Sequence, residues 1–505
     1  MKRKIFLLIG IVSFSILNAQ NTVDALRYST ENIQGTARFN SLSGAFGALG
    51  GDLSAIDINP AGSSVFLENT MALTFSVFNK SNSNSYFNST VKNEYSDFDI
   101  ANLGAVFVFD NRDESSNWKK FSLGINFNTH SNYDNELFVY GNSPRSVGNF
   151  FLDQAQGIPL DLLELRSGES ISDLYAFLGE TEGTEAQNAF LGYQAYIFDP
   201  VENDPSNTTY TSNFGSGVYS QDYALLTRGY AGKYSFNIST QYKDDYYFGI
   251  NFNAHTIDYR QSTYLFEGNN NSNSFIKTID FENNLSVLGN GFSMQAGAIA
   301  KINENIRVGF TYDTPTWFTI SEETTQFIET SFEDDDNSFT TTLSPNIINV
   351  FNDYKLSSPG KVSASAAYIF GKKGLLSLDY SYKDYSSIKF KPTSDVHFQT
   401  LNNVINNTLK GASTVKLGGE YRIQWVSLRG GLQFSESPYQ DKDILGDRKG
   451  YSLGLGFNFG NYNLDFAFVR TEQKSEEQLF NSGLSTPYSS NSNENNFIFT
   501  LGIDL

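Results

Sequence analysis

Basic side chains at alternate positions are the residues of this chain best suited to hold an anionic ligand. An arginine can bind a carboxylate through two parallel hydrogen bonds. Alternate positions of a strand share one face, and Glu420 falls on that face too. The candidate ligand-binding residues are Arg307, Lys416, Arg422 and Arg429. The alternative is that they form a ladder of ion pairs with neighbouring acids.

Residues that could support catalysis or bind a metal are scarce. The only histidines are His130, His255 and His397, and the chain has no cysteine. His130 and His255 fall on the polar face of their runs, but no metal-ligand spacing accompanies them, so hydrogen bonding is the simpler interpretation. A hydrolase needs a nucleophile, a base and a group that orients the base. We therefore predict no enzyme activity, no metal site and no cofactor.

The basic candidate residues are expected to lie on β-strands. Apolar and polar residues alternate in runs of about ten from Tyr230 to the C-terminus, which is the pattern of a strand with one apolar and one polar face. In 230–242 the aromatic and aliphatic side chains fall on one face, and Ser, Asn and Gln fall on the other. No stretch beyond the N-terminus approaches about 18 apolar residues, so transmembrane helices are excluded. Alternating strands joined by tight turns and long loops are the signature of a bacterial outer-membrane barrel.

About fourteen runs follow this pattern, an even number that suits a closed barrel with both termini in the periplasm. They lie near 70–80, 97–110, 119–133, 230–242, 245–261, 290–302, 305–320, 360–370, 374–388, 413–425, 426–436, 449–460, 462–474 and 495–505. Short and long connections alternate between them. The stretch 273–282 is a further strand candidate, and two extra strands would give about sixteen. We predict an all-β, transmembrane antiparallel barrel with long extracellular loops.

The N-terminus indicates export. A basic start, an apolar run over 5–17 and Ala19 predict a signal peptide, residues 1–19. The formal net charge of −20 disfavours binding to nucleic acid. We expect a multi-pass protein of the outer membrane of a Gram-negative cell, in contact with the lipid bilayer and lipopolysaccharide. Its assembly would use the barrel-assembly machinery, and we expect a monomer.

Two segments lack the alternation. Apolar residues in 131–229 are spaced like short amphipathic helices on a large extracellular loop, and 398–409 is a further helical candidate. Such helices would either cap the barrel or form an apolar landing groove. Residues 20–69 precede the first strand and contain the small-residue run Ser43–Gly51, which can pack closely in a confined space.

The segment 20–69 resembles the FadL-type (OmpP1/FadL/TodX) outer-membrane transporters, in the form common among Bacteroidota. The matching residues are Ala37, Arg38, Gly44, Gly47, Gly50, Gly51, Asp52, Ala55 and the motif Asn59, Pro60, Ala61. The resemblance implies that 20–69 is a hatch inside a barrel formed by 70–505. It also implies passive transport of long-chain fatty acids or similar hydrophobic compounds. Extracellular loops would capture the ligand, and release would pass the hatch, partly through a gap beside a kink in the third strand.

The main alternative is a structural or protein-secretion-associated barrel without small-molecule transport, which would have a stable protein partner. An energy-coupled receptor needs about 22 strands and a folded plug, more than this length supplies. The sequence does not name the ligand.

Overall fold

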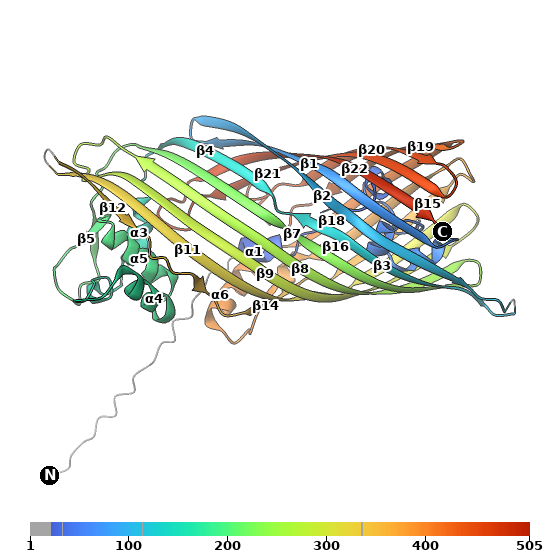
Figure 1. Cartoon of the computed structure of the whole chain (residues 1–505), viewed down its shortest axis with the longest axis horizontal. Coiled ribbons are helices and arrows are strands. Elements are labelled where there is room, and N and C mark those ends of the chain that lie inside the picture. The colour runs from blue at the N-terminus through green and yellow to red at the C-terminus, as the bar shows by residue number, and fades with distance from the viewer. Residues whose placement is uncertain (1–21, 33, 114, 335–336) are drawn as a thin grey trace, which may run out of the picture.

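The structure is a computed structural model that describes residues 22–32, 34–113, 115–334 and 337–505. The predicted signal peptide, residues 1–19, lies outside the described residues. Fourteen strand positions form a closed antiparallel barrel within the described part (Figure 1), which confirms the predicted fold class. The first strand, β1 (Thr70–Tyr86), pairs with both β2 (Ser89–Asp110) and the last strand, β22 (Pro487–Asp504), and so closes the wall.

Four of the remaining positions are each made of two successive segments. The other wall strands are β3 (Trp118–Asn132) with β4 (Asn135–Ser143), β7 (Tyr219–Tyr242), β8 (Tyr246–Gly268), β9 (Ile276–Lys301), β10 (Ile306–Asp313) with β11 (Thr316–Asp334), β15 (Lys361–Ile369) with β14 (Tyr354–Ser358), β16 (Gly374–Asp384) with β17 (Lys389–Lys391), β18 (Gly411–Ile423), β19 (Val426–Ser435), β20 (Arg448–Asn458) and β21 (Tyr462–Gln478). Shorter strands outside these positions are β5 (Phe198–Pro200), β6 (Tyr210–Ser212), β12 (Asn337–Leu343) and β13 (Asn349–Val350).

The stretch 273–282 does not add strands, because Ile276 onward is the start of β9. The longest strands, β7, β8 and β9, have 24, 23 and 26 residues. A bilayer needs only about 9–11 residues per tilted strand. These strands therefore continue beyond the membrane on the side of the long loops, which explains why a run such as 273–282 looked independent in the sequence.

The end of the barrel with the tight turns carries the lipid-facing surface. Exposed apolar side chains on the outer face include Phe107, Leu123, Ile125, Phe236, Ile238, Phe248, Ile250, Phe310, Leu378, Leu432, Leu453 and Phe499. Trp118, Trp317 and Trp425 are also exposed near strand ends, where aromatic rings favour the headgroup level. The alternation in the sequence thus separates a lipid face from a luminal face.

Helices occupy the lumen and the loop end of the barrel. Those preceding β1 are α1 (Thr22–Arg27), α2 (Ala37–Ser41), η1 (Ser54–Asp57) and η2 (Pro60–Val65). Those of the loops are α3 (Gly148–Ala155), η3 (Leu160–Leu162), α4 (Ile171–Thr181), α5 (Thr184–Gln194), η4 (Tyr385–Ser387) and α6 (Val396–Thr408). Figure 1 shows α1 within the barrel and α3 to α5 gathered at the end away from the C-terminus. A capping box of Ser170 and Asp173 starts α4, which buries Leu174 and Leu178 in the core of this extracellular part.

No helix in the described ranges is both long enough and apolar enough to cross a membrane.

The third strand position is kinked between β3 and β4. Gly229 of β7, at a φ of +115°, accepts a hydrogen bond from the Tyr133 N–H at 2.8 Å, and its own N–H donates to Asp134 at 2.8 Å. The ladder between β2 and β3 stops at Asn102 and Asn128. Above that point β4 pairs with β7, and no ladder joins it to β2 in the described residues.

We call the boundary between β4 and residues 89–101 of β2 the seam. Side chains hold it together in place of a backbone ladder. The Phe138 N–H of β4 donates to Asn93 of β2 at 3.1 Å, and Asn84 of β1 donates both to that Asn93 and to the Phe138 carbonyl, each at 3.2 Å. The kink that the resemblance implied therefore lies at Tyr133, a position that the sequence alone did not single out.

Candidate functional site

Residues 34–66, here called the plug, fill the barrel lumen near the tight turns. Asn59 caps η2 by accepting the Ala61 N–H at 3.1 Å, and Pro60 occupies the first helical position, where its missing N–H costs nothing. The Asn59 amide also donates to the Gly47 carbonyl at 2.7 Å and to the Ala298 carbonyl of β9 at 3.1 Å. Ala61 is fully buried. The Asn-Pro-Ala motif thus fixes a helical turn and ties it to the wall.

The plug glycines serve backbone shape and close approach. Gly44, Gly50 and Gly51 have φ values of +74°, +63° and +67°, which other residues rarely adopt. A Cβ on Gly47 would lie 2.0 Å from the hydroxyl oxygen of Ser365 on β15. The small-residue run is therefore the part of the plug that turns sharply against the wall.

Inward-facing glycines of the wall form a matching seat, which the sequence analysis missed. A Cβ on Gly309 would lie 2.1 Å from the Gly47 carbonyl oxygen, and one on Gly249 would lie 2.3 Å from the Pro60 carbonyl carbon. Glycine in the interior of a strand often marks a close approach of another backbone. Glycine at inward positions of predicted strands was the signal that could have revealed this seat.

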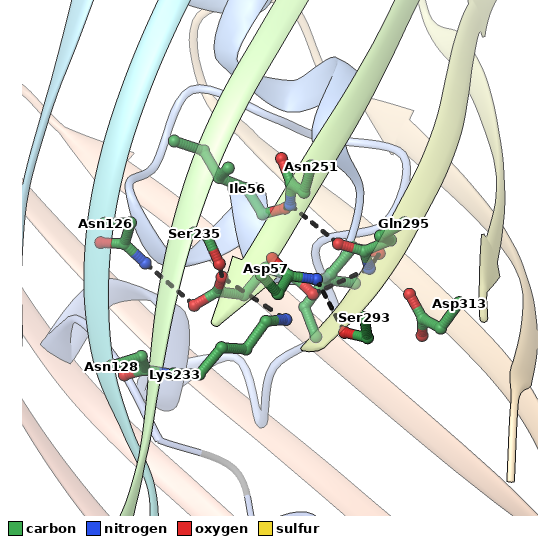
Figure 2. A network of polar contacts seen from close by, with 12 residues as sticks. Ile56, Asp57, Asn126, Asn128, Lys233, Ser235, Asn251, Ser293, Gln295 and Asp313 are labelled. Atoms are coloured by element: carbon green, nitrogen blue, oxygen red, sulfur yellow. Dashed lines mark hydrogen bonds and ion pairs between the residues drawn. The ribbon is translucent and has the colours of Figure 1, made fainter. Parts of the chain in front are cut away.

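A polar network joins η1 to the wall beside the seat (Figure 2). The Asp57 carboxylate accepts hydrogen bonds from Asn126 at 2.9 Å and from Ser235 at 2.7 Å. Lys233 forms an ion pair with the same carboxylate at 3.6 Å. Gln295 donates to the Asp57 carbonyl at 3.0 Å. Strands β3, β7 and β9 therefore all hold one residue of the plug.

Two of the predicted ligand-binding arginines lie in an ion-pair cluster. Arg422 and Arg429 contact opposite oxygens of Glu420 at 2.6 and 2.8 Å. Arg38 of the plug contacts Glu420 at 3.1 Å, and Arg429 also pairs with Asp465. Neither Arg422 nor Arg429 lines the lumen cavity described below. This arrangement matches the alternative interpretation of a luminal ion-pair ladder.

The other two candidates differ from each other. Arg307 donates to the Leu49 carbonyl at 3.0 Å and so contacts the plug. Lys416 lines the lumen cavity, and its side chain makes no hydrogen bond or ion pair within the described part of the chain. It also lines a small recess with Lys361 and Asp379. Of the four predicted residues, only Lys416 therefore faces the cavity.

A cavity of about 1680 Å³ lies above the plug, on the side of the long loops. Small-molecule pockets typically enclose about 300–1,000 Å³, so this one has room for a large ligand. Toward the loops its lining includes the apolar side chains Leu137, Phe150, Phe281 and Phe480, together with polar ones such as Gln154. The Phe150 and Phe480 rings are 4.8 Å apart between centroids. A ligand tail would find a hydrophobic surface there.

Residues 22–32, here called the luminal arm, run along the cavity from α1 toward the plug. The Arg27 guanidinium stacks 4.2 Å from the ring centroid of Tyr259 on β8. Leu26 and Tyr28 belong to a hydrophobic cluster against which Tyr133, the residue at the kink of the third strand, also packs. The luminal arm therefore covers the inner face of the wall at that kink.

Lys361 and Lys383 bind the C-terminal end of the luminal arm, although neither was among the predicted ligand-binding residues. Lys361 contacts the Glu31 carboxylate at 2.5 Å and Asp313 at 3.1 Å, while Lys383 contacts Glu31 at 3.1 Å. Lys383 also donates to the Ser29 carbonyl at 2.7 Å. Burial alone would raise the pKa of Glu31, but Lys361 and Lys383 together hold that pKa well below its ordinary value. Glu31 is therefore an ionised carboxylate in a basic pocket.

The histidines and a serine motif do not assemble an active site. His130 and His255 line the cavity with ring centroids 6.5 Å apart, and His255 bonds to Ser293 at 2.8 Å. No group of three potential metal ligands occurs in the described ranges. Ser452 stands in a Gly-x-Ser-x-Gly stretch, but it lies within β20 and its hydroxyl bonds to Ser43 at 2.8 Å. A nucleophile of that motif needs a strand-to-helix turn.

Comparison with known proteins gives one family and one fold. The family model described as outer membrane protein transport protein (OMPP1/FadL/TodX) matches residues 203–504. A FadL homologue of Pseudomonas aeruginosa is 12% identical, with 94% of this chain and 99% of that chain covered and a TM-score of 0.54. The Pseudomonas putida toluene transporter TodX is 11% identical, with 94% and 99% covered and a TM-score of 0.51. A comparison with curated proteins gives no match. At such identities the two solved structures establish the fold alone.

Proposed function

Because this chain belongs to the outer membrane protein transport family (OMPP1/FadL/TodX), we propose that it is a passive transporter of long-chain fatty acids or similar hydrophobic compounds. The family consists of outer-membrane channels for hydrophobic compounds and not of enzymes. The choice of fatty acids within that class is our proposal.

The division of the lumen cavity carries this proposal. Toward the loops it offers a group of apolar side chains that includes Phe150 and Phe281, and its floor holds Lys361, Lys383 and Lys416. Each buried methylene of a ligand tail contributes about 0.8 kcal/mol. A carboxylate head could bind the lysines through charge-assisted hydrogen bonds, which are stronger than neutral ones. An amphiphile with one negative head and a long tail fits both ends.

Entry would occur between the extracellular loops. The cavity extends to Pro438, Ile444, Leu479 and Phe480 in the loops after β19 and β21. An apolar molecule crosses the polar lipopolysaccharide layer poorly, so an apolar surface among the loops would lower its barrier to entry.

Release straight through the plug would be costly. Net contributions of about 0.5–1.5 kcal/mol per hydrogen bond make it unfavourable to break all the contacts of Asp57, Asn59 and Arg38 with the wall together. A local shift of the luminal arm breaks fewer contacts. We therefore propose that the ligand leaves sideways through the seam, where side chains replace the backbone ladder between β2 and β4.

The test is purification in mild detergent followed by mass spectrometry of the bound small molecules. We expect a lipid-like compound to co-purify and a 16-carbon fatty acid to bind the emptied protein. A stoichiometric protein partner without any lipid-like ligand would instead support the alternative, a structural or protein-secretion-associated barrel.

A further inference from the structure

Glu31 occupies the place where the proposed function puts the head of a ligand. Its carboxylate lies between the ammonium groups of Lys361 and Lys383 on the cavity floor. The bond from Lys383 to the Ser29 carbonyl fixes the backbone beside it. The chain thus supplies its own carboxylate to a basic pocket that opens into the cavity.

The charges around the pocket do not balance without Glu31. Three lysines, Lys361, Lys383 and Lys416, face this region. Of the nearby acids, Asp313 pairs with Lys361, whereas Asp379 accepts hydrogen bonds from backbone N–H groups of the plug. The Lys361 and Lys383 side chains are only 17% and 9% exposed, so loss of the Glu31 carboxylate leaves their charges poorly solvated and less compensated. Glu31 therefore leaves readily only when another anion takes its place.

We propose that Glu31 is an internal competitor for the carboxylate of the ligand. This inference rests on the proposed transport function. A ligand carboxylate replaces that of Glu31 between Lys361 and Lys383, with Lys416 beside it, and the luminal arm then leaves its position. The head of the ligand, rather than its tail, triggers the change, since an uncharged molecule cannot compensate the two lysines.

Displacement of the luminal arm would act directly on the seam. The Asn32 N–H contacts the His130 carbonyl of β3 at 3.4 Å, and Leu26 and Tyr28 pack in the cluster that holds Tyr133. When these contacts are lost, the inner face of the kinked third strand is uncovered. Head binding and sideways release of the ligand are in this way coupled through one segment.

The test compares hexadecanoate with hexadecanol, which share a tail and differ in charge. In purified protein, Glu31→Gln keeps the shape of the side chain but removes the competing charge. We expect it to tighten hexadecanoate binding roughly tenfold and to leave hexadecanol binding unchanged. Glu304→Gln, in an exposed periplasmic turn, is the matched control and should change neither. The double variant Lys361→Gln, Lys383→Gln should lose the preference for hexadecanoate.

A second measurement uses the unchanged protein, so it does not depend on how the variants fold. Hydrogen exchange of residues 22–32 should accelerate with saturating hexadecanoate but not with hexadecanol. If both probes bind but neither Glu31→Gln nor hexadecanoate has these effects, the competition is refuted and the transport proposal stands. If neither probe binds, the proposed function itself fails, and the competition fails with it.

Discussion

The plug and the luminal arm both form ion pairs with the wall, but the plug also packs its backbone against glycines of the wall. At Gly249 and Gly309 the wall has no side chain, and the plug backbone lies in the space this leaves. The arm is instead held by Lys361, Lys383 and Arg448. Shape complementarity allows no substitute occupant, but a charge accepts any suitable counter-charge. The two halves of the N-terminal segment therefore suit different tasks, one as a seal and the other as a removable cover.

A larger side chain in the glycine seat of the wall should disturb the plug more than any of the other substitutions. Gly309→Val places a Cβ 2.1 Å from the Gly47 carbonyl oxygen, a steric overlap that forces the plug to shift, and overpacking typically costs about 1–3 kcal/mol. We expect the plug to become accessible to protease and the barrel to conduct ions in planar bilayers. Gly430→Val is the control. Gly430 is on the lipid-facing side, and a Cβ there would lie 3.7 Å from its nearest neighbour, the Ser452 carbonyl oxygen. A closed, protected Gly309→Val protein would show that the seat does not hold the plug.

Removal of the Asn59 side chain, which caps η2, should have a smaller effect than the substitution of Gly309. Asn59→Ala removes an N-cap worth about 1 kcal/mol, one hydrogen bond to the Gly47 carbonyl of the plug and one to the Ala298 carbonyl of the wall, so we expect a local loss of about 2 kcal/mol. Faster hydrogen exchange at 60–65, with little change at 22–32, would support separate attachment of the two parts. Asn79→Ala, which removes an exposed hydrogen bond to Ser96, serves as the control.

Acid should release the luminal arm. The pKa of Glu31 is lowered in the folded protein, so its stabilising contribution is complete above the ordinary value of 4.5 and is lost as pH falls through the lowered folded value. A spin label on Val23→Cys, in a chain without other cysteines, reports the mobility of the arm. We expect mobility to increase only well below pH 4.5. In Glu31→Gln the label should be mobile at every pH, and equal profiles for the two proteins would count against the charge argument.

The local stability of the extracellular part should depend on pH in the opposite direction. This is the smallest of the expected effects on the lumen. Burial raises the pKa of Glu267, on β8 beyond the membrane, to about 7, even though Ser146, Val147 and Gln221 donate hydrogen bonds to it. The folded state then binds the extra proton, so local stability falls as pH rises from 4.5 through 7. Hydrogen exchange at α3, compared in wild type and Glu267→Gln at pH 5.5 and 8, measures it. The variant should lose this dependence.

The wall was predictable from the sequence, but most of the lumen was not. Alternation placed Phe248 and Ile250 outward and Arg422 and Arg429 inward because a strand has only two faces. It did not show that Glu420 would engage both arginines. Lys361 and Lys383 lay within predicted strands and could have been chosen by the same parity.

Their partner, Glu31, could not have been found in this way. It lies in a stretch without helix or strand, so no periodicity fixes the direction of its side chain. The kink at Tyr133 was equally hidden, since it depends on Gly229, which is distant in sequence and lies in the neighbouring strand. The local sequence pattern therefore predicts the strands of the wall, whereas the structure of the lumen depends on contacts between residues that are distant in sequence.

The wall glycines also constrain the order in which the molecule is built. The plug precedes every strand in the chain, and the barrel closes when β1 pairs with β22, the last strand to be synthesised. The Ala37 N–H already bonds to Thr500 on that closing strand at 2.7 Å. The seat at Gly249 and Gly309 lies on the inner face of this wall, so a plug that is already in place when β22 pairs with β1 need not travel along a closed lumen to reach it. We therefore expect the N-terminal segment to serve as the template around which the strands are joined.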